Sequence, residues 1–312
     1  MEDSFVHDPC LTREGETHYV FSTGREAVGD GNIQVRASED LRRWRYVGTV
    51  FPQLPTWIRA RIPGVRSLWA PDICQHQGRY HLYYAASTFG RNTSVIGLAS
   101  NATLDPASSA WRWVDHGPVL ASTSADDWNA IDPSFVTDEQ GRPWLACGSF
   151  WTGIQLLSLD APGAGPAAAP VRLHALARRP VAPHAIEAPC IHFRRPYFYL
   201  FVSFDLCCRG VHSTYRIMVG RSAQVTGPYL GADGQPMLEG GGTLLLQTEG
   251  AMIGPGGQSV QGDGEVERMV YHYYDALDGG RARLQIRNLL WSEDGWPRVG
   301  PPLVPTPEER QA

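Results

Sequence analysis

Four acidic residues stand out because each lies in a short motif that contains proline. The motifs are His7-Asp8-Pro9, Ala70-Pro71-Asp72, Ile131-Asp132-Pro133 and Glu187-Ala188-Pro189, and successive acids are 64, 60 and 55 residues apart. A period of this length is typical of a repeat architecture, in which each unit places its equivalent residue beside a common axis. We therefore expect several carboxyl groups to converge in one pocket, where they could donate and accept protons.

Each acid is followed by a turn and an aromatic, β-rich run, and then by a second extended run. The first runs cover residues 17–22, 80–84, 143–146 and 197–202, and the second runs cover residues 32–37, 94–99, 153–157 and 215–220. These patterns predict hairpins that belong to units of three or four strands. A fifth unit repeats the layout between Ile253 and Trp296 but has no acid at its start.

Five such units in 312 residues predict an all-β fold, namely a five-bladed β-propeller that occupies residues 1–312 as a single domain. The alternative is an ordinary β-sandwich with coincidental Asp-Pro turns, since Asp and Pro are good turn residues anywhere. Acids at matching places in matching hairpins favour the propeller. Radial closure leaves few exposed sheet edges, so we also expect a monomer.

The composition excludes several classes of function. The chain has 32 acidic and 27 basic residues without a basic stripe, so nucleic acid is not an expected partner. All 27 basic residues are Arg, which rules out Schiff-base chemistry, pyridoxal phosphate attachment and a P-loop lysine. No 18-residue apolar run suggests a membrane span, and no signal peptide is recognisable. We expect a secreted protein if an export signal was removed, and a cytoplasmic one otherwise.

Six cysteines are too few for a disulfide scaffold at this length, and we expect them to be buried free thiols. The adjacent pair Cys207-Cys208 could in principle form a strained disulfide. No Cys-x-x-Cys or His-rich spacing points to a zinc site.

The motifs, taken in order, resemble those of glycoside hydrolase family 43, and within it the endo-1,5-α-L-arabinanases, along essentially the whole chain. Members of that family are five-bladed propellers, which agrees with the number of repeats. The matching segments are residues 6–9, 21–24, 38–41 with Trp44, 68–72, 87–90, 129–133, 148–151, 187–189, 207–210 and 272–275.

The resemblance implies an inverting glycosidase that uses three of the four acids. Asp8 corresponds to the general base that activates water, and Glu187 to the general acid that protonates the departing oxygen. Asp132 corresponds to a residue that orients Glu187 and, as an ionised neighbour, raises its pKa. Inversion requires the acid and the base to stand about 6.5–9.5 Å apart. Asp72 matches a family motif but is expected to have a structural or orienting role.

The same resemblance suggests residues that contact the sugar. We expect the aromatic platforms to be Trp69, Phe89 and Trp151, and the polar contacts to be Asn129, Ser149 and Arg209. Taken singly, each of these residues could equally well be a packing residue.

Related arabinanases also hold an axial metal ion, usually calcium, with a histidine as its protein ligand and water completing the shell. His272 matches that histidine, so the resemblance implies one metal ion and no organic cofactor. The chain departs from the family nearby, because it has Gly254-Pro255-Gly256-Gly257 where relatives commonly carry Gly-Pro-Gly-His. We expect the missing side chain to alter a subsite or the solvent around the ion.

Three functions are consistent with the sequence. The leading one is endo-hydrolysis of α-1,5-linked arabinan, because residues 207–210 and 87–90 match arabinanases rather than the family at large. The second is exo action on the same triad, as an exo-arabinanase, an α-L-arabinofuranosidase or a β-xylosidase. The third is a carbohydrate-binding propeller without catalysis, which the intact Asp8, Asp132 and Glu187 argue against.

Overall fold

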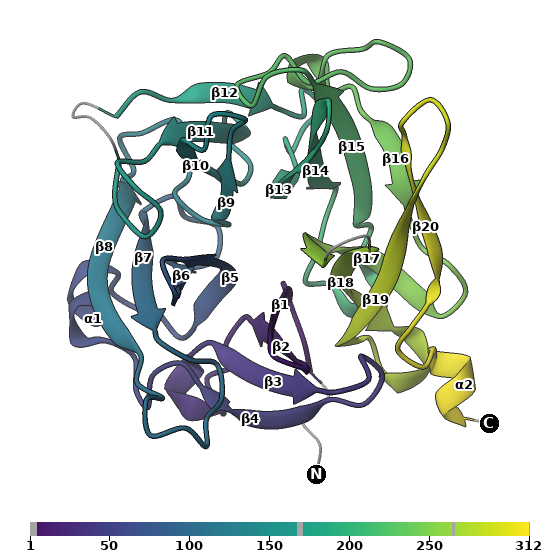
Figure 1. The fold of residues 1–312 in the computed structure, drawn as a ribbon. Coiled ribbons are helices and arrows are strands. Elements are labelled where there is room, and N and C mark those ends of the chain that lie inside the picture. The colour runs from purple at the N-terminus through teal and green to yellow at the C-terminus, as the bar shows by residue number, and fades with distance from the viewer. Residues whose placement is uncertain (1–4, 167–170, 264–265, 312) are drawn as a thin grey trace.

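Five β-sheets stand around a common axis (Figure 1). The structure is a computed structural model that describes residues 5–166, 171–263 and 266–311. In these residues, four consecutive strands form each sheet, with an antiparallel order from the first strand to the fourth. The predicted all-β fold and the five-bladed β-propeller are confirmed.

The twenty described strands are distributed evenly over the blades. Blade one contains β1 (Cys10–Glu14), β2 (Thr17–Ser22), β3 (Gln34–Ser38) and β4 (Arg45–Thr49). Blade two contains β5 (Leu68–His76), β6 (Arg79–Ala86), β7 (Ser94–Asn101) and β8 (Val114–Ser122). Blade three contains β9 (Ser134–Thr137), β10 (Pro143–Cys147), β11 (Ile154–Ser158) and β12 (His174–Ala177). Blade four contains β13 (Ile186–Arg194), β14 (Tyr197–Phe204), β15 (Arg216–Ser222) and β16 (Thr243–Leu246). Blade five contains β17 (Met252–Asp263), β18 (Val266–Asp275), β19 (Arg281–Trp291) and β20 (Pro297–Pro302).

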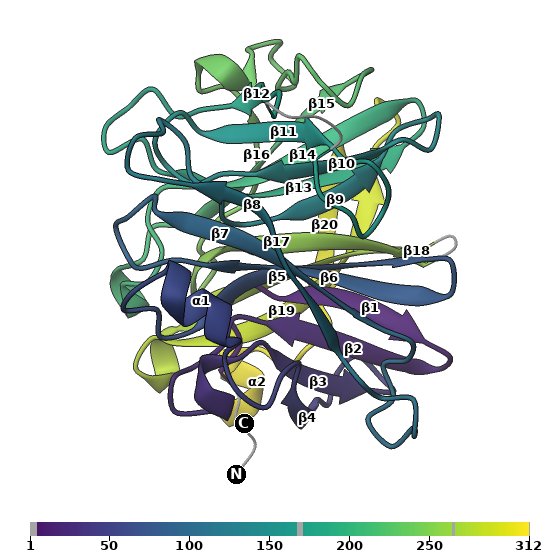
Figure 2. The same cartoon turned by 90° about the vertical axis from the view of Figure 1, so that its left-hand side faces the viewer.

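Helices are few and short. The α-helices are α1 (Thr56–Arg61) and α2 (Pro307–Gln311), and the 3-10 turns are η1 (Gly29–Gly31), η2 (Gly210–His212), η3 (Met237–Glu239) and η4 (Ala276–Asp278). Among the described residues, no helix is long and apolar enough to cross a membrane. Figure 2, a view from the side, shows α1 and α2 outside the stacked strands.

The hydrophobic core is divided among the five contacts between neighbouring blades. Phe21 and Tyr84, for example, are buried in the cluster between blades one and two. Phe201 and Tyr271 are buried in the cluster between blades four and five. The second strand of each blade supplies many of these side chains, because both of its faces pack against protein. This explains the continuous aromatic and β-branched runs in the sequence.

A backbone feature recurs where the inner strands begin. In four blades the residue before a proline has a left-handed conformation, with φ of 48° at Asp8, 40° at Ala70, 55° at Asp132 and 52° at Ala188. In blade five, Gly257 has a φ of 57°, and no proline follows it. A left-handed residue other than glycine costs roughly 1–2 kcal/mol, so the surrounding structure must hold these turns in place.

The left-handed residue, and not the acid, is therefore the position that repeats. Asp8 and Asp132 occupy this position, whereas Glu187 comes one residue before it and Asp72 two residues after it. The expectation that all four acids are structurally equivalent was wrong. Because the side chains leave the turn at different points, the acids have different surroundings despite similar sequence motifs.

Blades one and five close the ring without sharing a sheet. The amide of Val6 donates a hydrogen bond to the carbonyl oxygen of Ala282 at 3.1 Å, and Ser259 Oγ donates to the carbonyl oxygen of Pro9 at 3.1 Å. Arg36 Nη2 also donates to the carbonyl oxygen of Phe5 at 2.8 Å. The segment that carries Asp8 is thus held on both sides.

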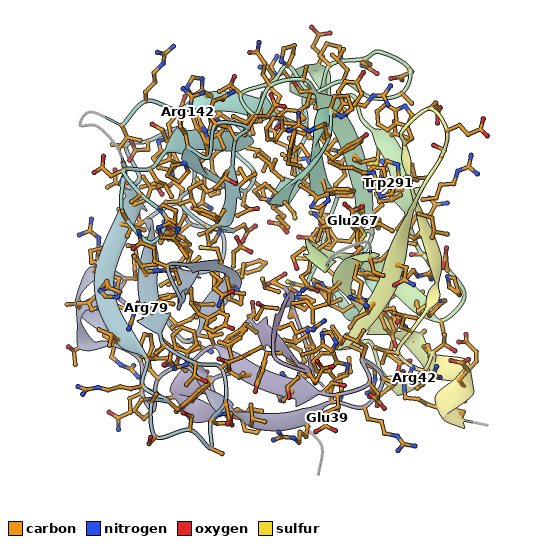
Figure 3. The ribbon with its side chains drawn as sticks, viewed as in Figure 1. Glu39, Arg42, Arg79, Arg142, Glu267 and Trp291 are labelled. Atoms are coloured by element: carbon orange, nitrogen blue, oxygen red, sulfur yellow. The ribbon has the colours of Figure 1, made fainter. Side chains whose placement is uncertain are left out.

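Further from the axis, a polar contact joins blades four and five. His192 Nε2 lies 2.8 Å from Glu267 Oε1, and the indole of Trp291 donates to the same carboxylate. Figure 3 shows Glu267 and Trp291 close together in blade five. Arg194 adds its guanidinium 4.8 Å above the Trp291 ring.

Asp72 connects the first three blades near the axis. Its Oδ2 accepts a hydrogen bond from the amide of Phe135 at 2.6 Å, and its Oδ1 accepts one from Cys10 Sγ at 3.3 Å. Burial raises its pKa to about 6. These contacts support the structural role expected for Asp72.

Replacing Asp72 should therefore destabilise the propeller. At pH 5, below the raised pKa, we expect Asp72→Ala to lower the free energy of unfolding by about 1–3 kcal/mol, because the buried amide of Phe135 loses its acceptor. Urea denaturation would measure the change. Asp72→Asn keeps an acceptor oxygen and should lose less, so equal losses in the two variants would contradict this explanation.

Candidate active site

Asp8 lies at the axis and accepts hydrogen bonds from two side chains of the first blade. Its Oδ2 accepts from Thr23 Oγ1 at 2.7 Å and from His7 Nδ1 at 2.8 Å. Thr23 Oγ1 in turn accepts from the amide of Ala70 at 2.9 Å. Sequence reasoning did not single out His7 or Thr23 as site residues, although both lie in segments that carry the family resemblance.

These donors keep Asp8 ionised. Burial by itself would raise its pKa, but the charge and hydrogen bond of His7 and the hydrogen bond of the Thr23 hydroxyl outweigh burial and lower the pKa to about 2. Burial also opposes protonation of His7, yet the charge of Asp8 raises the pKa of His7 well above its ordinary value. Asp8 and His7 are therefore an ion pair at neutral pH.

Asp132 and Glu187 form the second acidic group of the site. Asp132 Oδ2 accepts a hydrogen bond from the amide of Ala188 at 2.9 Å, which fixes the turn that carries Glu187. Burial raises the pKa of Asp132 well above its ordinary value, and the charges of Glu187 and Asp8 add to this effect. Burial likewise raises the pKa of Glu187 to about 7, with further increases from Cys208 and Asp8.

The physical cause of the raised Glu187 pKa therefore differs from the expected one. Sequence reasoning attributed it to an ionised Asp132, whereas burial is the largest cause and Asp132 is itself hard to ionise. Because both carboxyl groups are buried and repel each other when charged, the pair keeps a proton at neutral pH.

Two hydroxyl groups hold the Glu187 carboxyl group. Ser149 Oγ donates to Glu187 Oε2 at 2.7 Å, and the phenol of Tyr215 hydrogen-bonds to Oε1. Ser149 thus positions Glu187, and its expected contact with the sugar stays a prediction. Tyr215 was missed as a site residue, because its place directly before β15 marks it only as part of a strand.

The aromatic platforms differ in how far they are exposed. The Phe89 side chain is prominent, because 82% of the residue's surface is exposed, and Trp151 is 39% exposed. Trp69 is half-buried, and its indole donates to Ser67 Oγ at 2.9 Å. Their exposure leaves the Phe89 and Trp151 rings accessible to a ligand, and the sugar-binding role of all three rings stays a prediction.

The polar residues expected to contact sugar are placed differently from one another. Asn129 is only 2% exposed, and its Oδ1 accepts a hydrogen bond from Ser94 Oγ at 2.6 Å. This burial argues against direct contact with a substrate. Arg209 is exposed in the loop between β14 and β15, where its amide donates to Ser213 Oγ at 3.1 Å. The sugar-binding role of Arg209 stays a prediction.

His272, the expected metal ligand, is fully buried beside Asp8. Its Nδ1 accepts a hydrogen bond from the amide of Asp8 at 3.1 Å, and its ring stacks on His7 with 3.7 Å between centroids. Burial lowers its pKa well below the ordinary value, so the imidazole is neutral. In a neutral ring whose Nδ1 accepts, Nε2 carries the hydrogen. Nε2 has no hydrogen-bond partner within the part of the chain that the structure describes.

His7, Asp8 and His272 place donor atoms within 4.8 Å of one another, but His272 offers no free lone pair to a directly coordinated calcium ion. The nitrogen that carries a hydrogen cannot donate a lone pair, and the other nitrogen is already used by Asp8. Calcium takes six to eight oxygen ligands, whereas Asp8 Oδ2 already accepts two hydrogen bonds. The axial calcium ion remains a prediction that this arrangement does not support.

Gly257 explains how Asp8 and His272 come so close together. A Cβ atom at this position would lie 2.4 Å from Asp8 Oδ1 and 2.7 Å from the His272 ring. The residue also has a φ of 57°, which glycine adopts without strain. The absent side chain therefore leaves the space that the Asp8 and His272 side chains occupy in this arrangement.

A small cavity of about 30 Å³ lies on the axis next to these groups, with room for a water molecule or two. Residues from all five blades line it, among them Asp8, Asp72, Asp132, Gly257 and Ala188. Three of the four acids, Asp8, Asp72 and Asp132, thus converge on this cavity as expected. Glu187 interacts with Asp132 and Asp8 through its charge.

An ionised carboxylate and a protonated carboxyl pair at the axis of a β-propeller define an acid–base centre of the kind that glycoside hydrolases use. The family model described as "Glycosyl hydrolases family 43" matches residues 3–297. The chain belongs to this family and is a glycoside hydrolase, as the sequence motifs predicted.

Similar proteins include arabinan-degrading enzymes of both modes of action. The chain is 43% identical to the extracellular exo-α-(1→5)-L-arabinofuranosidase ArbA of Cellvibrio japonicus, over 94% of this chain and 86% of that protein. It is also 43% identical to the extracellular endo-α-(1→5)-L-arabinanase 1 of Bacillus subtilis, over 95% and 88% of the two chains. A solved structure of Cellvibrio cellulosa α-L-arabinanase with arabinohexaose has a TM-score of 0.89 and 43% identity, over 95% of each chain.

The raised pKa of Glu187 should make its replacement stabilising at alkaline pH. Burial raises the pKa from 4.5 to about 7. Between these pH values the unfolded chain releases the proton while the folded chain keeps it. The free energy of unfolding of the wild type therefore falls by up to about 3 kcal/mol as the pH rises. Glu187→Gln has no proton to release. We expect its free energy of unfolding, relative to the wild type, to increase between pH 4.5 and 8 in urea titrations.

The exposed Glu16, whose side chain is 97% accessible, provides the matched control. Glu16→Gln should follow the wild-type curve at each pH. A Glu187→Gln advantage that stays constant with pH would show that the carboxyl group has no raised pKa.

Proposed function

We propose that this enzyme hydrolyses internal α-1,5-L-arabinofuranosidic bonds of arabinan by a single displacement with inversion. The observation that carries the proposal is the opposite protonation of two acids at one axis, with the pKa of Asp8 lowered to about 2 and that of Glu187 raised to about 7. General acid–base catalysis needs one ionised and one protonated group at the same pH.

In this mechanism Asp8 removes a proton from water as the water attacks the anomeric carbon. Glu187 gives its proton to the departing glycosidic oxygen at the same time, and the configuration inverts because the attack comes from the opposite face. Asp132 holds the amide of Ala188 and so orients the turn that carries Glu187. His7 and Thr23 keep Asp8 charged and aligned through their hydrogen bonds to Oδ2.

The substrate assignment is supported by the relatives and by the exposed rings. Arabinan or an arabino-oligosaccharide is the substrate class named for the similar enzymes. The exposed Phe89 and Trp151 project from blades two and three and offer flat apolar surfaces to furanose rings. We infer that the five blades act as one monomeric catalytic domain, since the ring closes between its own first and fifth blades.

Exo action on the same polymer is the second candidate. It is favoured by the 43% identity to the exo-acting ArbA, which equals the identity to the endo-acting enzyme of Bacillus subtilis. The same three acids would serve both modes, because endo and exo action differ in access to the chain ends and not in bond cleavage.

A time course on linear, debranched arabinan distinguishes the two modes. We expect a rapid fall in viscosity together with a ladder of oligosaccharides, because an endo enzyme cuts inside the polymer. A single small product from the start, with little change in viscosity, would establish exo action. An absence of any product would contradict both assignments.

The assignment of Glu187 as general acid has its own test. Glu187→Ala should slow cleavage of arabinan by about 10²–10⁴-fold, because the sugar oxygen leaves poorly without a proton. An aryl arabino-oligosaccharide with an acidic phenol as leaving group should lose far less. Steady-state rates on both substrates, with Glu16→Ala as control, measure the difference, and equal losses would remove Glu187 from this role.

A further inference from the structure

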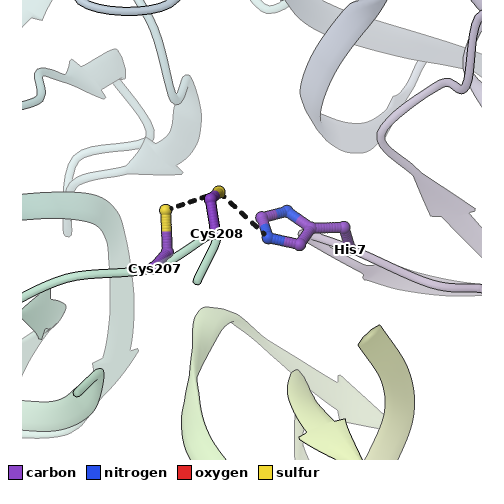
Figure 4. A group of neighbouring side chains, drawn as sticks. All are labelled: His7, Cys207 and Cys208. Carbon is purple, nitrogen blue, oxygen red and sulfur yellow. Dashed lines mark hydrogen bonds between the residues drawn. The ribbon is translucent and has the colours of Figure 1, made fainter. Parts of the chain in front are cut away.

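A pair of adjacent thiols faces His7 on the side away from Asp8. Cys207 and Cys208 lie in the loop between β14 and β15, and Figure 4 shows the His7 ring directed at Cys208 with Cys207 beyond it. Cys208 Sγ is 3.7 Å from His7 Nε2, and the two sulfur atoms are 2.8 Å apart. All three donor atoms lie within 4.8 Å of one another.

This group differs from what the sequence predicted for the cysteines. All six are free thiols, and Cys10, Cys147 and Cys190 are buried as expected. Cys208 is exposed, however, and Cys74 and Cys207 are half-buried, so the expectation of burial was wrong for these three. No spacing in the sequence pointed to a metal site, because His7 stands 201 residues away from Cys208.

We propose that His7 Nε2, Cys207 Sγ and Cys208 Sγ bind one thiophilic divalent cation, such as Zn²⁺, with water in the fourth position. Imidazole and thiolate are the ligands that zinc prefers, and three protein ligands with one open position are a common zinc arrangement. The ion would sit beside the proposed active site and is distinct from an axial calcium ion, which prefers oxygen ligands.

The distances are compatible with such an ion after a small movement. Bonds of about 2.3 Å to sulfur and 2.0–2.1 Å to nitrogen place tetrahedral S and N ligands about 3.6 Å apart and two S ligands about 3.8 Å apart. The observed 3.7 Å between Cys208 Sγ and His7 Nε2 already fits. The sulfur atoms must separate by about 1 Å, which the exposed Cys208 side chain can do by turning about its Cα–Cβ bond.

The chemistry of the donors also favours a cation. The hydrogen bond from Cys207, together with the nearby His7, lowers the pKa of Cys208 to about 5, and the thiolate is the form that binds metals. Asp8 Oδ2 accepts from His7 Nδ1, which directs Nε2 toward the sulfur atoms, as carboxylates do for zinc-binding histidines. Binding would replace the proton on His7 Nε2 and the thiol proton of Cys207, both of which leave to solvent, and it would replace the contact of Nε2 with Tyr274 Oη.

A disulfide between the same cysteines is less favourable. The Cα atoms of adjacent residues are 3.8 Å apart across a trans peptide, whereas disulfides join Cα atoms that are 4.4–6.8 Å apart. A disulfide here would be strained and easily reduced. A bridging cation needs the two sulfur atoms further apart and avoids this constraint.

A bound cation would also inhibit the enzyme. Its positive charge would favour the ionised form of Glu187, the proposed general acid, and would neutralise the Cys208 charge that helps to keep Glu187 protonated. This consequence rests on the proposed function, whereas cation binding itself does not.

Calorimetric titration of the whole, reduced protein with zinc chloride under nitrogen tests the binding. We expect one ion per chain in the wild type, a Kd at least tenfold higher in Cys208→Ser, and no binding in the Cys207→Ser/Cys208→Ser double variant. Cys74→Ser makes the same substitution outside the group and should bind like the wild type. Thermal unfolding of each variant shows whether it is folded.

The proposal is overturned if the reduced wild type binds no zinc, or if the folded double variant binds as tightly as the wild type. It is also overturned if the protein keeps a Cys207–Cys208 disulfide under mild reductant, seen as a peptide lighter by two hydrogens. Zinc that binds without slowing arabinan cleavage would overturn the inhibitory role alone. Cleavage of arabinan by the zinc-free enzyme is measured separately. Failure of the proposed function can therefore be told apart from failure of the zinc site.

Discussion

Two carboxyl groups that are buried side by side cannot both be charged, and the active site of this propeller depends on that constraint. The pair of Asp132 and Glu187 keeps a proton at neutral pH because burial disfavours the charged forms of both groups. Asp8 is also buried, but His7 compensates its charge. One fold thus maintains an acid and a base at the same pH, and the difference between them comes from their partners and not from their residue types.

The ring supplies these partners through five similar turns. Each turn brings the chain to the axis with a left-handed residue, and four of the five are not glycine. The energy stored in such turns must be offset by packing between blades, where the aromatic second strands form the core. A single hydrogen bond from the amide of Ala188 to Asp132 then couples the acid pair to the backbone of the next blade. The same contacts therefore stabilise the fold and determine the pKa values of the acid pair.

His7 connects the catalytic group to the exposed thiols. Its Nδ1 side serves Asp8, while its Nε2 side faces Tyr274 and Cys208. Because the imidazole contacts both a buried carboxylate and a thiol, a change in the charge of the thiol alters the electrostatic environment of the carboxylate. The chemistry of Cys208 is thus linked to that of Asp8 even though neither residue touches the other directly. Gly257 and His272 lie on the other side of Asp8, where a Cβ atom at position 257 would collide with both side chains.

The sequence by itself determined the five-bladed fold, the positions of Asp8, Asp132 and Glu187, and the family, because turn residues and strand runs are local patterns that repeat along the chain. It did not reveal that the acids occupy different turn positions, that Ser149 and Tyr215 hold Glu187, or that Asn129 is buried. It also suggested His272 as a metal ligand, whereas the Asp8 amide uses the available nitrogen. Only the tertiary structure decided these points, since they depend on contacts between blades. Side chains that are 200 residues apart, such as His7 and Cys208, meet because the ring closes, and no local pattern encodes that meeting.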